Sequence, residues 1–220
     1  MLTIVFDLDG TLVDTAPDLI ETLNFTLKQH SLPTVPYDDA RPLIGGGART
    51  MIERALILEG RSATSADVDA LYAPFVAHYA EHIADRSRPF PGLLPVLDRL
   101  AAAGHPLAVC TNKLERLSKR LLDALELSGR FAAICGQDTF GVQKPDPQMF
   151  RATMTAPAAS QPAPSWSGIP LPISALRERR MCRWWQWILA IPTCRSRPLD
   201  RTGSLARLPS CPASSLLSPL

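Results

Sequence analysis

The chain has 220 residues, enough for one large α/β domain or for one domain with a small insertion. A formal net charge of +2 gives no reason to expect a nucleic-acid or membrane partner. Five cysteines without CxxC spacing argue against a zinc site or a disulfide framework. The N-terminal residues carry no basic leader, and no apolar run is long enough to cross a bilayer. We therefore expect a cytoplasmic protein.

The N-terminal part predicts one strand followed by helices. Residues 2–6 form a short apolar run with β-branched members, which is typical of a buried strand. Residues 14–18, Asp-Thr-Ala-Pro-Asp, are typical of a helix start. Two further segments, 50–58 and 67–84, have helical spacing of apolar residues. Residues 14–86 are therefore predicted to be mostly helical, up to the Pro- and Gly-containing break at 88–92.

Helices and strands then alternate. We predict a helix over 93–103, a strand over 107–110, a helix over 114–125 and a strand over 131–135. Alternation of this kind indicates a parallel sheet with right-handed crossovers. Because such sheets bind ligands at the carboxyl ends of their strands, the polar residues after each strand are the candidate site.

Three segments carry these candidates. Asp7 and Asp9 project to the same side of an extended segment, where two carboxylates suit magnesium and one can attack phosphorus. Thr111 and Asn112 follow the strand over 107–110, at a helix N-terminus that suits a phosphate oxygen. Lys144, held before a proline, can place its ammonium against phosphate. Taken singly, the three segments also fit a strand-end turn, a helix cap and an exposed loop lysine.

Together, in this order, the segments resemble the haloacid dehalogenase-like phosphatase superfamily, whose first motif is DxDGT after strand one. The stretches FDLDGTLVDTAPDL, RPLIGGGART, FPG, TNK and KPDPQMF are similar to those of bacterial phosphoglycolate phosphatases. The resemblance covers residues 2 to about 153. It implies an α/β Rossmann-like core, 1–13 and 87–153, with a helical cap, 14–86, inserted after strand one.

The resemblance also implies a role for each candidate. Asp7 would be the nucleophile that forms an aspartyl-phosphate, and Asp9 the general acid and then the general base. The Asp7 carboxylate and the Asp9 main-chain carbonyl would hold Mg²⁺. Thr111 and Asn112 would bind the transferred phosphoryl group, and Lys144 would neutralise its charge.

The cap contains Gly45-Gly46-Gly47-Ala48-Arg49, in which Gly46 and Arg49 are candidates for contact with a substrate carboxylate. A flexible turn between helices is the alternative for this stretch. The implied substrate is a small phosphate ester, with 2-phosphoglycolate first, another sugar phosphate or a mutase reaction second, and an inactive remnant third. The expected assembly is a monomer or a homodimer.

Residues 154–220 do not fit this pattern. They hold eight Arg, no Lys, two acidic residues and ten of the 21 prolines, and they lack the family's fourth motif, Gly-Asp-Ser followed by an acid. Read in the frame that starts at each third codon base, residues 164–170 permit Ile-Met-Val-Gly-Asp-Ser. We therefore expect a frameshift near 153–157 and a tail without a compact core, apart from one helix over 177–191. A basic, Trp-rich surface for nucleic acid or membrane is the alternative for this tail.

Overall fold

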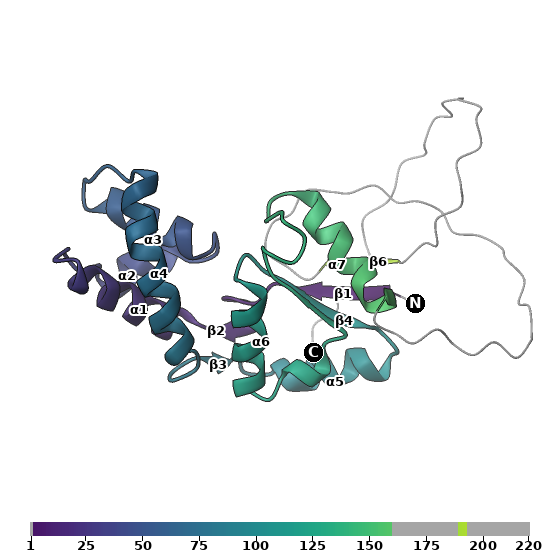
Figure 1. The fold of residues 1–220 in the computed structure, drawn as a ribbon. Helices are drawn as coiled ribbons and strands as arrows, with labels where there is room; N and C mark the ends of the chain where they lie inside the picture. Colours follow the sequence, from purple (N-terminus) through teal and green to yellow (C-terminus); the bar gives the residue numbers. More distant parts are fainter. Residues whose placement is uncertain (1, 160–188, 193–220) are drawn as a thin grey trace, which may run out of the picture.

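The computed structural model describes residues 2–159 and 189–192 of the chain. Strand β1 (Leu2–Phe6) lies inside a four-stranded sheet of order β5-β4-β1-β6 (Figure 1). Strands β4 (Leu107–Cys110) and β5 (Ala133–Cys135) run parallel to β1, and Phe6 is in register with Val109. The predicted α/β fold is confirmed, and β1 lies beside the strand over 107–110.

Helices cover both faces of the sheet (Figure 1). Ile4 and Phe6 of β1 belong to the same buried cluster as Leu97 and Leu121, whereas Val5 packs with Met149 on the other face. This alternation follows from the opposite directions of successive side chains in a strand. The helical segments here are α5 (Leu93–Ala102), α6 (Glu115–Ala124), the 3-10 turn η2 (Ser128–Arg130) and α7 (Pro147–Ala159).

A separate group of helices follows β1 in the sequence and lies to one side of the sheet (Figure 1). It comprises α1 (Ala16–Gln29), α2 (Tyr37–Ala40), the 3-10 turn η1 (Arg41–Leu43), α3 (Ala48–Leu58) and α4 (Ser65–Glu81). The two connections to the sheet are β2 (Val13–Asp14) and β3 (Arg88–Pro89), which pair antiparallel. Sequence analysis did not predict this pairing, since each strand has only two residues.

Asp18 links the start of α1 to the residues that precede β3. Its carboxylate is 3% exposed and accepts hydrogen bonds from the backbone N–H groups of Arg86 and Ser87, at 2.9 and 2.7 Å. The Ser87 hydroxyl donates to the same carboxylate at 2.6 Å. The start of α1 is therefore fixed to the segment that leads back into the sheet.

The C-terminal part differs from the sequence predictions at three places: the end of α7, the direction of one strand and residues 189–191. Helix α7 continues to Ala159, beyond the boundary drawn at Thr153, with Thr153 fully buried. Strand β6 (Leu189–Pro192) pairs antiparallel with β1, so the sheet is mixed rather than wholly parallel. Unpaired N–H and C=O groups at the edge of β1 are a template for such pairing. The helix predicted over 177–191 is wrong at 189–191, and the remainder of that prediction and of the predicted tail lies outside the described residues.

Within the described ranges, every helix is too short or too polar to cross a bilayer.

Candidate active site

Asp7 and Lys144 meet at the carboxyl end of the parallel strands. Asp7 directly follows β1, and Lys144 lies three residues before α7. The Lys144 Nζ atom lies 2.8 Å from Asp7 Oδ1, and the two side chains are 26% and 38% exposed. Burial raises the pKa of the Asp7 carboxyl above its ordinary value, and Lys144 opposes that shift. A carboxylate that is accessible and paired with one cation has the features of a nucleophile for a charged substrate.

Asp9 lies two residues further on, and its carboxylate has other partners. Oδ1 accepts a hydrogen bond from the Thr15 hydroxyl at 2.7 Å and lies 2.8 Å from the Nζ atom of Lys113. Its side chain is only 12% exposed. Two carboxylates two residues apart therefore have separate partners, Lys144 for Asp7 and Lys113 for Asp9, which suits different chemical roles.

Lys113 is a buried cation that joins the sheet to the helical group. Its side chain is 6% exposed, and its ammonium donates to the Tyr79 hydroxyl of α4 at 2.7 Å as well as contacting Asp9. Burial acts to lower the Lys113 pKa, but Asp9 and Tyr79 outweigh it, so the pKa lies above its ordinary value. Burial raises the pKa of Tyr79 to about 12, so this hydroxyl stays protonated and accepts from Lys113 at neutral pH.

Lys113, Tyr79 and Thr15 were not among the predicted site residues. Lys113 directly follows Thr111 and Asn112, and this position could have identified it as a site residue. The helical spacing over 67–84 predicts that Tyr79 lies on a buried face. Spacing of this kind identifies a buried face but not the polar partners of its residues.

Thr111 and Asn112 lie at the predicted edge of the sheet, directly after β4. Thr111 is 1% exposed, and its hydroxyl oxygen accepts from the Lys113 N–H at 3.2 Å, which leaves the hydroxyl proton to donate elsewhere. The Asn112 amide accepts from the Lys144 N–H at 2.8 Å and donates to the Lys144 carbonyl at 3.1 Å. The Asn112 side chain therefore fixes the Lys144 loop, and the two residues act as one unit.

The glycine segment of the helical group contacts the sheet part through Gly45 and Gly47. The Gly45 carbonyl accepts from the Asn112 amide at 3.4 Å. A Cβ atom on Gly47, which has a φ of +86°, would lie 2.8 Å from the Asn112 carbonyl oxygen. Arg49 instead pairs with Asp69 at 2.6 Å, with both side chains 53% exposed. Gly46 and Arg49 are absent from the residues that line the cavity described next.

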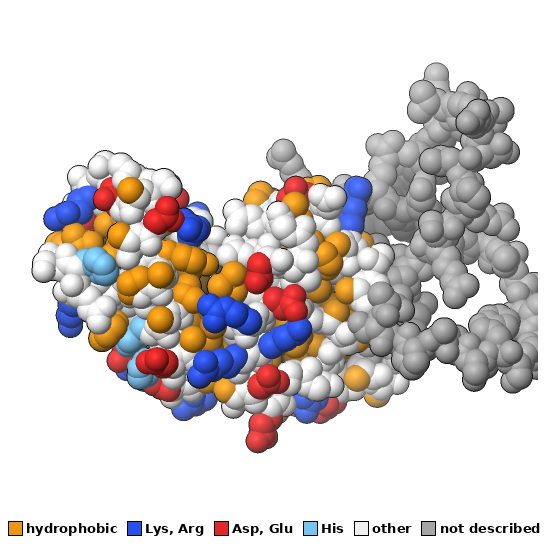
Figure 2. Space-filling view, viewed as in Figure 1, with side chains coloured by type: hydrophobic (Ala, Val, Ile, Leu, Met, Phe, Trp, Pro, Cys, Tyr) orange, Lys and Arg blue, Asp and Glu red, His pale blue; other side chains and the backbone are white. Residues whose placement is uncertain are grey.

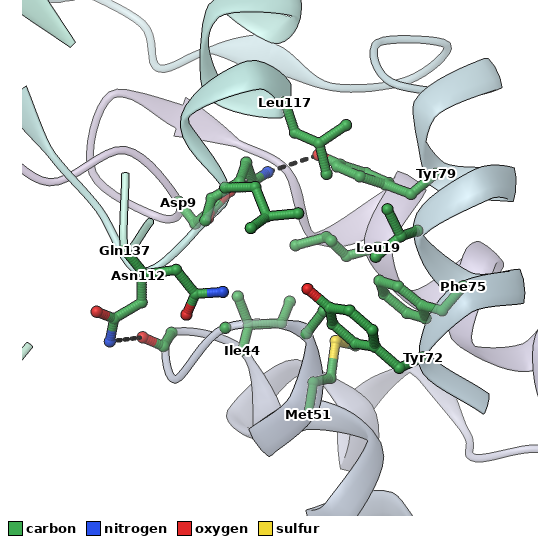
Figure 3. A pocket seen from close by; sticks show the side chains of 16 residues that line it. Asp9, Leu19, Ile44, Met51, Tyr72, Phe75, Tyr79, Asn112, Leu117 and Gln137 are labelled. Atoms are coloured by element: carbon green, nitrogen blue, oxygen red, sulfur yellow. Dashed lines mark hydrogen bonds and ion pairs between the residues drawn. The ribbon is translucent and has the colours of Figure 1, made fainter. Parts of the chain in front are cut away.

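A cavity of about 40 Å³ lies between the two parts of the molecule (Figure 3). That volume holds a few water molecules, since one needs roughly 10–15 Å³. Figure 3 shows Leu19, Tyr72 and Phe75 facing Asp9 and Asn112 across this space. The outline of the molecule is hollowed at the same junction, and hydrophobic side chains extend over the helical part (Figure 2). Most of the apolar wall comes from the helical group, with Leu114 and Leu117 from the sheet part, and the polar groups come mainly from the sheet edge.

The donor set fits magnesium in part. The half-exposed Asp7 carboxylate is a hard oxygen ligand, and the Asp9 carbonyl accepts no hydrogen bond from the described residues. Magnesium keeps several waters and often uses one or two protein oxygens together with a substrate phosphate. The Asp9 carboxylate points to Lys113 and Thr15, so the two carboxylates do not converge on one ion. The described part of the chain contains no group of three or more His, Cys, Asp or Glu side chains suited to a metal.

Comparison with known proteins places this geometry in a family. A model of the haloacid dehalogenase-like hydrolases matches residues 4–162. The chain belongs to this family. It is 49% identical to a phosphoglycolate phosphatase of Agrobacterium fabrum over 68% of this chain and 64% of that protein. It is also 49% identical to one of Caulobacter vibrioides, over 70% of this chain and 65% of that protein.

Solved structures agree with the fold. The crystal structure of a predicted phosphoglycolate phosphatase from Haemophilus somnus 129pt matches with a TM-score of 0.61 and 30% identity, covering 68% of each chain. The chain spans slightly less than two thirds of the two curated relatives. The family match ends at residue 162, which agrees with a C-terminal third that is foreign to the family.

Proposed function

We propose that this chain is a phosphatase that hydrolyses small phosphate monoesters, with 2-phosphoglycolate as its substrate. The observation that carries the proposal is that two neighbouring carboxylates pair with different cations. Asp7 lies 2.8 Å from Lys144, and Asp9 lies 2.8 Å from Lys113. The names of the two relatives from Agrobacterium fabrum and Caulobacter vibrioides, each 49% identical, support the substrate.

In the first half-reaction, Asp7 attacks phosphorus and forms a phosphorus–oxygen bond while the bond to the leaving oxygen breaks. Asp9 donates its proton to that oxygen, which departs as an alcohol. In the second, Asp9 removes a proton from water, the water oxygen attacks the aspartyl-phosphate, and inorganic phosphate leaves. The phosphoryl oxygens would be bound by Lys144, the Thr111 hydroxyl and the Asn112 backbone N–H, which has no partner among the described residues. These donors suit phosphoryl transfer, which depends mainly on positioning and charge neutralisation.

Magnesium, held by the Asp7 carboxylate and the Asp9 carbonyl, would screen the repulsion between the nucleophile and the phosphate. The helical group, residues 14–86, would act as a cap that opens and closes about the paired strands β2 and β3. Closure would exclude bulk water while the aspartyl-phosphate forms and would bring Tyr79 against Lys113.

The alternative is an inactive remnant produced by the frameshift. It is favoured by the end of the family match at residue 162 and by the lack of a third metal-ligating acid among the described residues. The acids of the fourth motif would then be missing from the magnesium site. Sequencing the DNA across codons 150–160 distinguishes a true shift from a sequence error.

Phosphate release from 2-phosphoglycolate with Mg²⁺ tests the proposal, with a panel of sugar phosphates for the substrate alternative. The 220-residue chain and the frame-corrected chain are assayed side by side. We expect Asp7→Asn to abolish turnover, because an amide does not attack phosphorus. Asp9→Asn should bind substrate and turn over about 10²–10⁴-fold more slowly, the usual contribution of proton transfer. A frame-corrected chain that leaves every phosphate ester intact would refute the proposal, and activity only after correction would identify the given chain as the remnant.

A further inference from the structure

We propose that Lys113 recognises a carboxylate on the carbon next to the leaving oxygen, and so selects 2-phosphoglycolate over phosphate esters that lack a second anionic group. The inference rests on the proposed function, because it assigns a specificity residue to that same site. It also replaces the predicted role of Arg49, whose guanidinium pairs with Asp69 and lies over the Tyr72 ring.

The position of Lys113 follows from that of Asp9. If Asp9 protonates the leaving oxygen, this oxygen lies against the Asp9 carboxyl. In 2-phosphoglycolate a single methylene separates that oxygen from the carboxylate. Because the Lys113 ammonium lies 2.8 Å from Asp9 Oδ1, it is within reach of a carboxylate attached at that distance.

Among the described residues that line the cavity between the two parts of the molecule, Lys113 is the one Lys or Arg. An ammonium has three N–H donors, and Asp9 and Tyr79 are its two polar partners among the described residues. One donor is thus available to a ligand. The remaining described wall is largely apolar, so Lys113 is the cationic side chain there that a carboxylate entering the cavity can meet.

The surroundings of Lys113 favour an anionic ligand. Its ammonium is buried and faces a largely apolar wall, where a charge is costly unless it is paired. A substrate carboxylate would give this cation a second ionic partner beside Asp9. An uncharged hydroxyl at the same place would not, so the site discriminates by charge and not only by size.

Binding measurements by calorimetry on the full chain without added Mg²⁺, so that the esters are not hydrolysed during the titration, test this assignment. The ligands are 2-phosphoglycolate, 2-hydroxyethyl phosphate, which has a hydroxyl in place of the carboxylate, and inorganic phosphate. We expect the wild-type chain to prefer 2-phosphoglycolate about 10- to 100-fold, the range for a hydrogen bond to a charged group. Lys113→Met should abolish this preference. Lys28→Met, on an exposed lysine of α1, should retain it and serves as the matched control.

Other outcomes overturn the inference. If Lys113→Met weakens both esters equally, Lys113 acts only by positioning Asp9. If the preference survives in Lys113→Met, another group reads the carboxylate. Wild-type chain that binds inorganic phosphate but shows no preference refutes this inference alone, whereas wild-type chain that binds none of the ligands refutes the proposed phosphate site as well.

A second measurement needs no variant and covers the case that Lys113→Met does not fold. The ¹⁵N signal of the Lys113 ammonium, assigned through its side chain, should move on binding 2-phosphoglycolate more than on binding 2-hydroxyethyl phosphate. Equal movement with the two esters would contradict a direct contact with the carboxylate.

Discussion

Removal of the Asp18 carboxylate should destabilise the junction between the helical group and the sheet. Asp18→Ala leaves three donors without their acceptor, the N–H groups of Arg86 and Ser87 and the Ser87 hydroxyl. Ser87 is fully buried, so water does not readily replace the lost partner. At about 1–3 kcal/mol for each buried donor left unsatisfied, and less where the site relaxes, we expect a loss of about 3–5 kcal/mol.

Glu21→Ala is the matched control, because Glu21 lies on the same helix and also contacts Arg86. Its ion pair with Arg86 has a 2.5 Å separation, but the two side chains are 60% and 62% exposed. An exposed pair of this kind contributes about 0–1 kcal/mol. Urea denaturation of both variants measures the difference. If Asp18→Ala lowers the free energy of unfolding no more than Glu21→Ala does, Asp18 does not stabilise the junction between the helical group and the sheet.

Three further predictions concern the site and its cap. Asn112→Ala should lower phosphate affinity about as much as Lys144→Met, because the Asn112 side chain fixes the Lys144 backbone. The double variant should therefore lose no more affinity than either single variant. Calorimetry with inorganic phosphate measures these losses, and additive losses would contradict the prediction. Gly47→Ala should cost about 1–3 kcal/mol, since a side chain at φ +86° is strained and its Cβ would meet the Asn112 carbonyl at 2.8 Å; an unchanged melting temperature would contradict this. Hydrogen bonds from Thr64 lower the pKa of Asp67, so the stability difference between wild type and Asp67→Asn should be present at neutral pH and vanish as the pH falls below about 3.8; a constant difference would argue against the capping box.

Much of the sheet edge was predictable because strand ends in a parallel sheet converge. Apolar runs identified β1 and β4, and β4 has the predicted bounds of 107–110. Once those strands are adjacent, Asp7 and Thr111 must follow them at the same edge. The contact of Lys144 with Asp7 across 137 positions of sequence required the resemblance to a known motif, since local pattern alone allows an exposed loop lysine.

The partners of Asp9 were decided only by the tertiary structure. Periodicity placed Tyr79 on a buried face, but the docking of α4 against the end of β4 determined that its hydroxyl meets Lys113. The packing of α3 against α4 pairs Arg49 with Asp69, and the docking of the helical group against the sheet part brings Gly45 and Gly47 to Asn112. The sequence by itself thus determined which groups stand at the strand ends, because that depends on chain order and pleat. Which cation faces which carboxylate depends on how the helical group packs against the sheet part, and no local sequence pattern determines that packing.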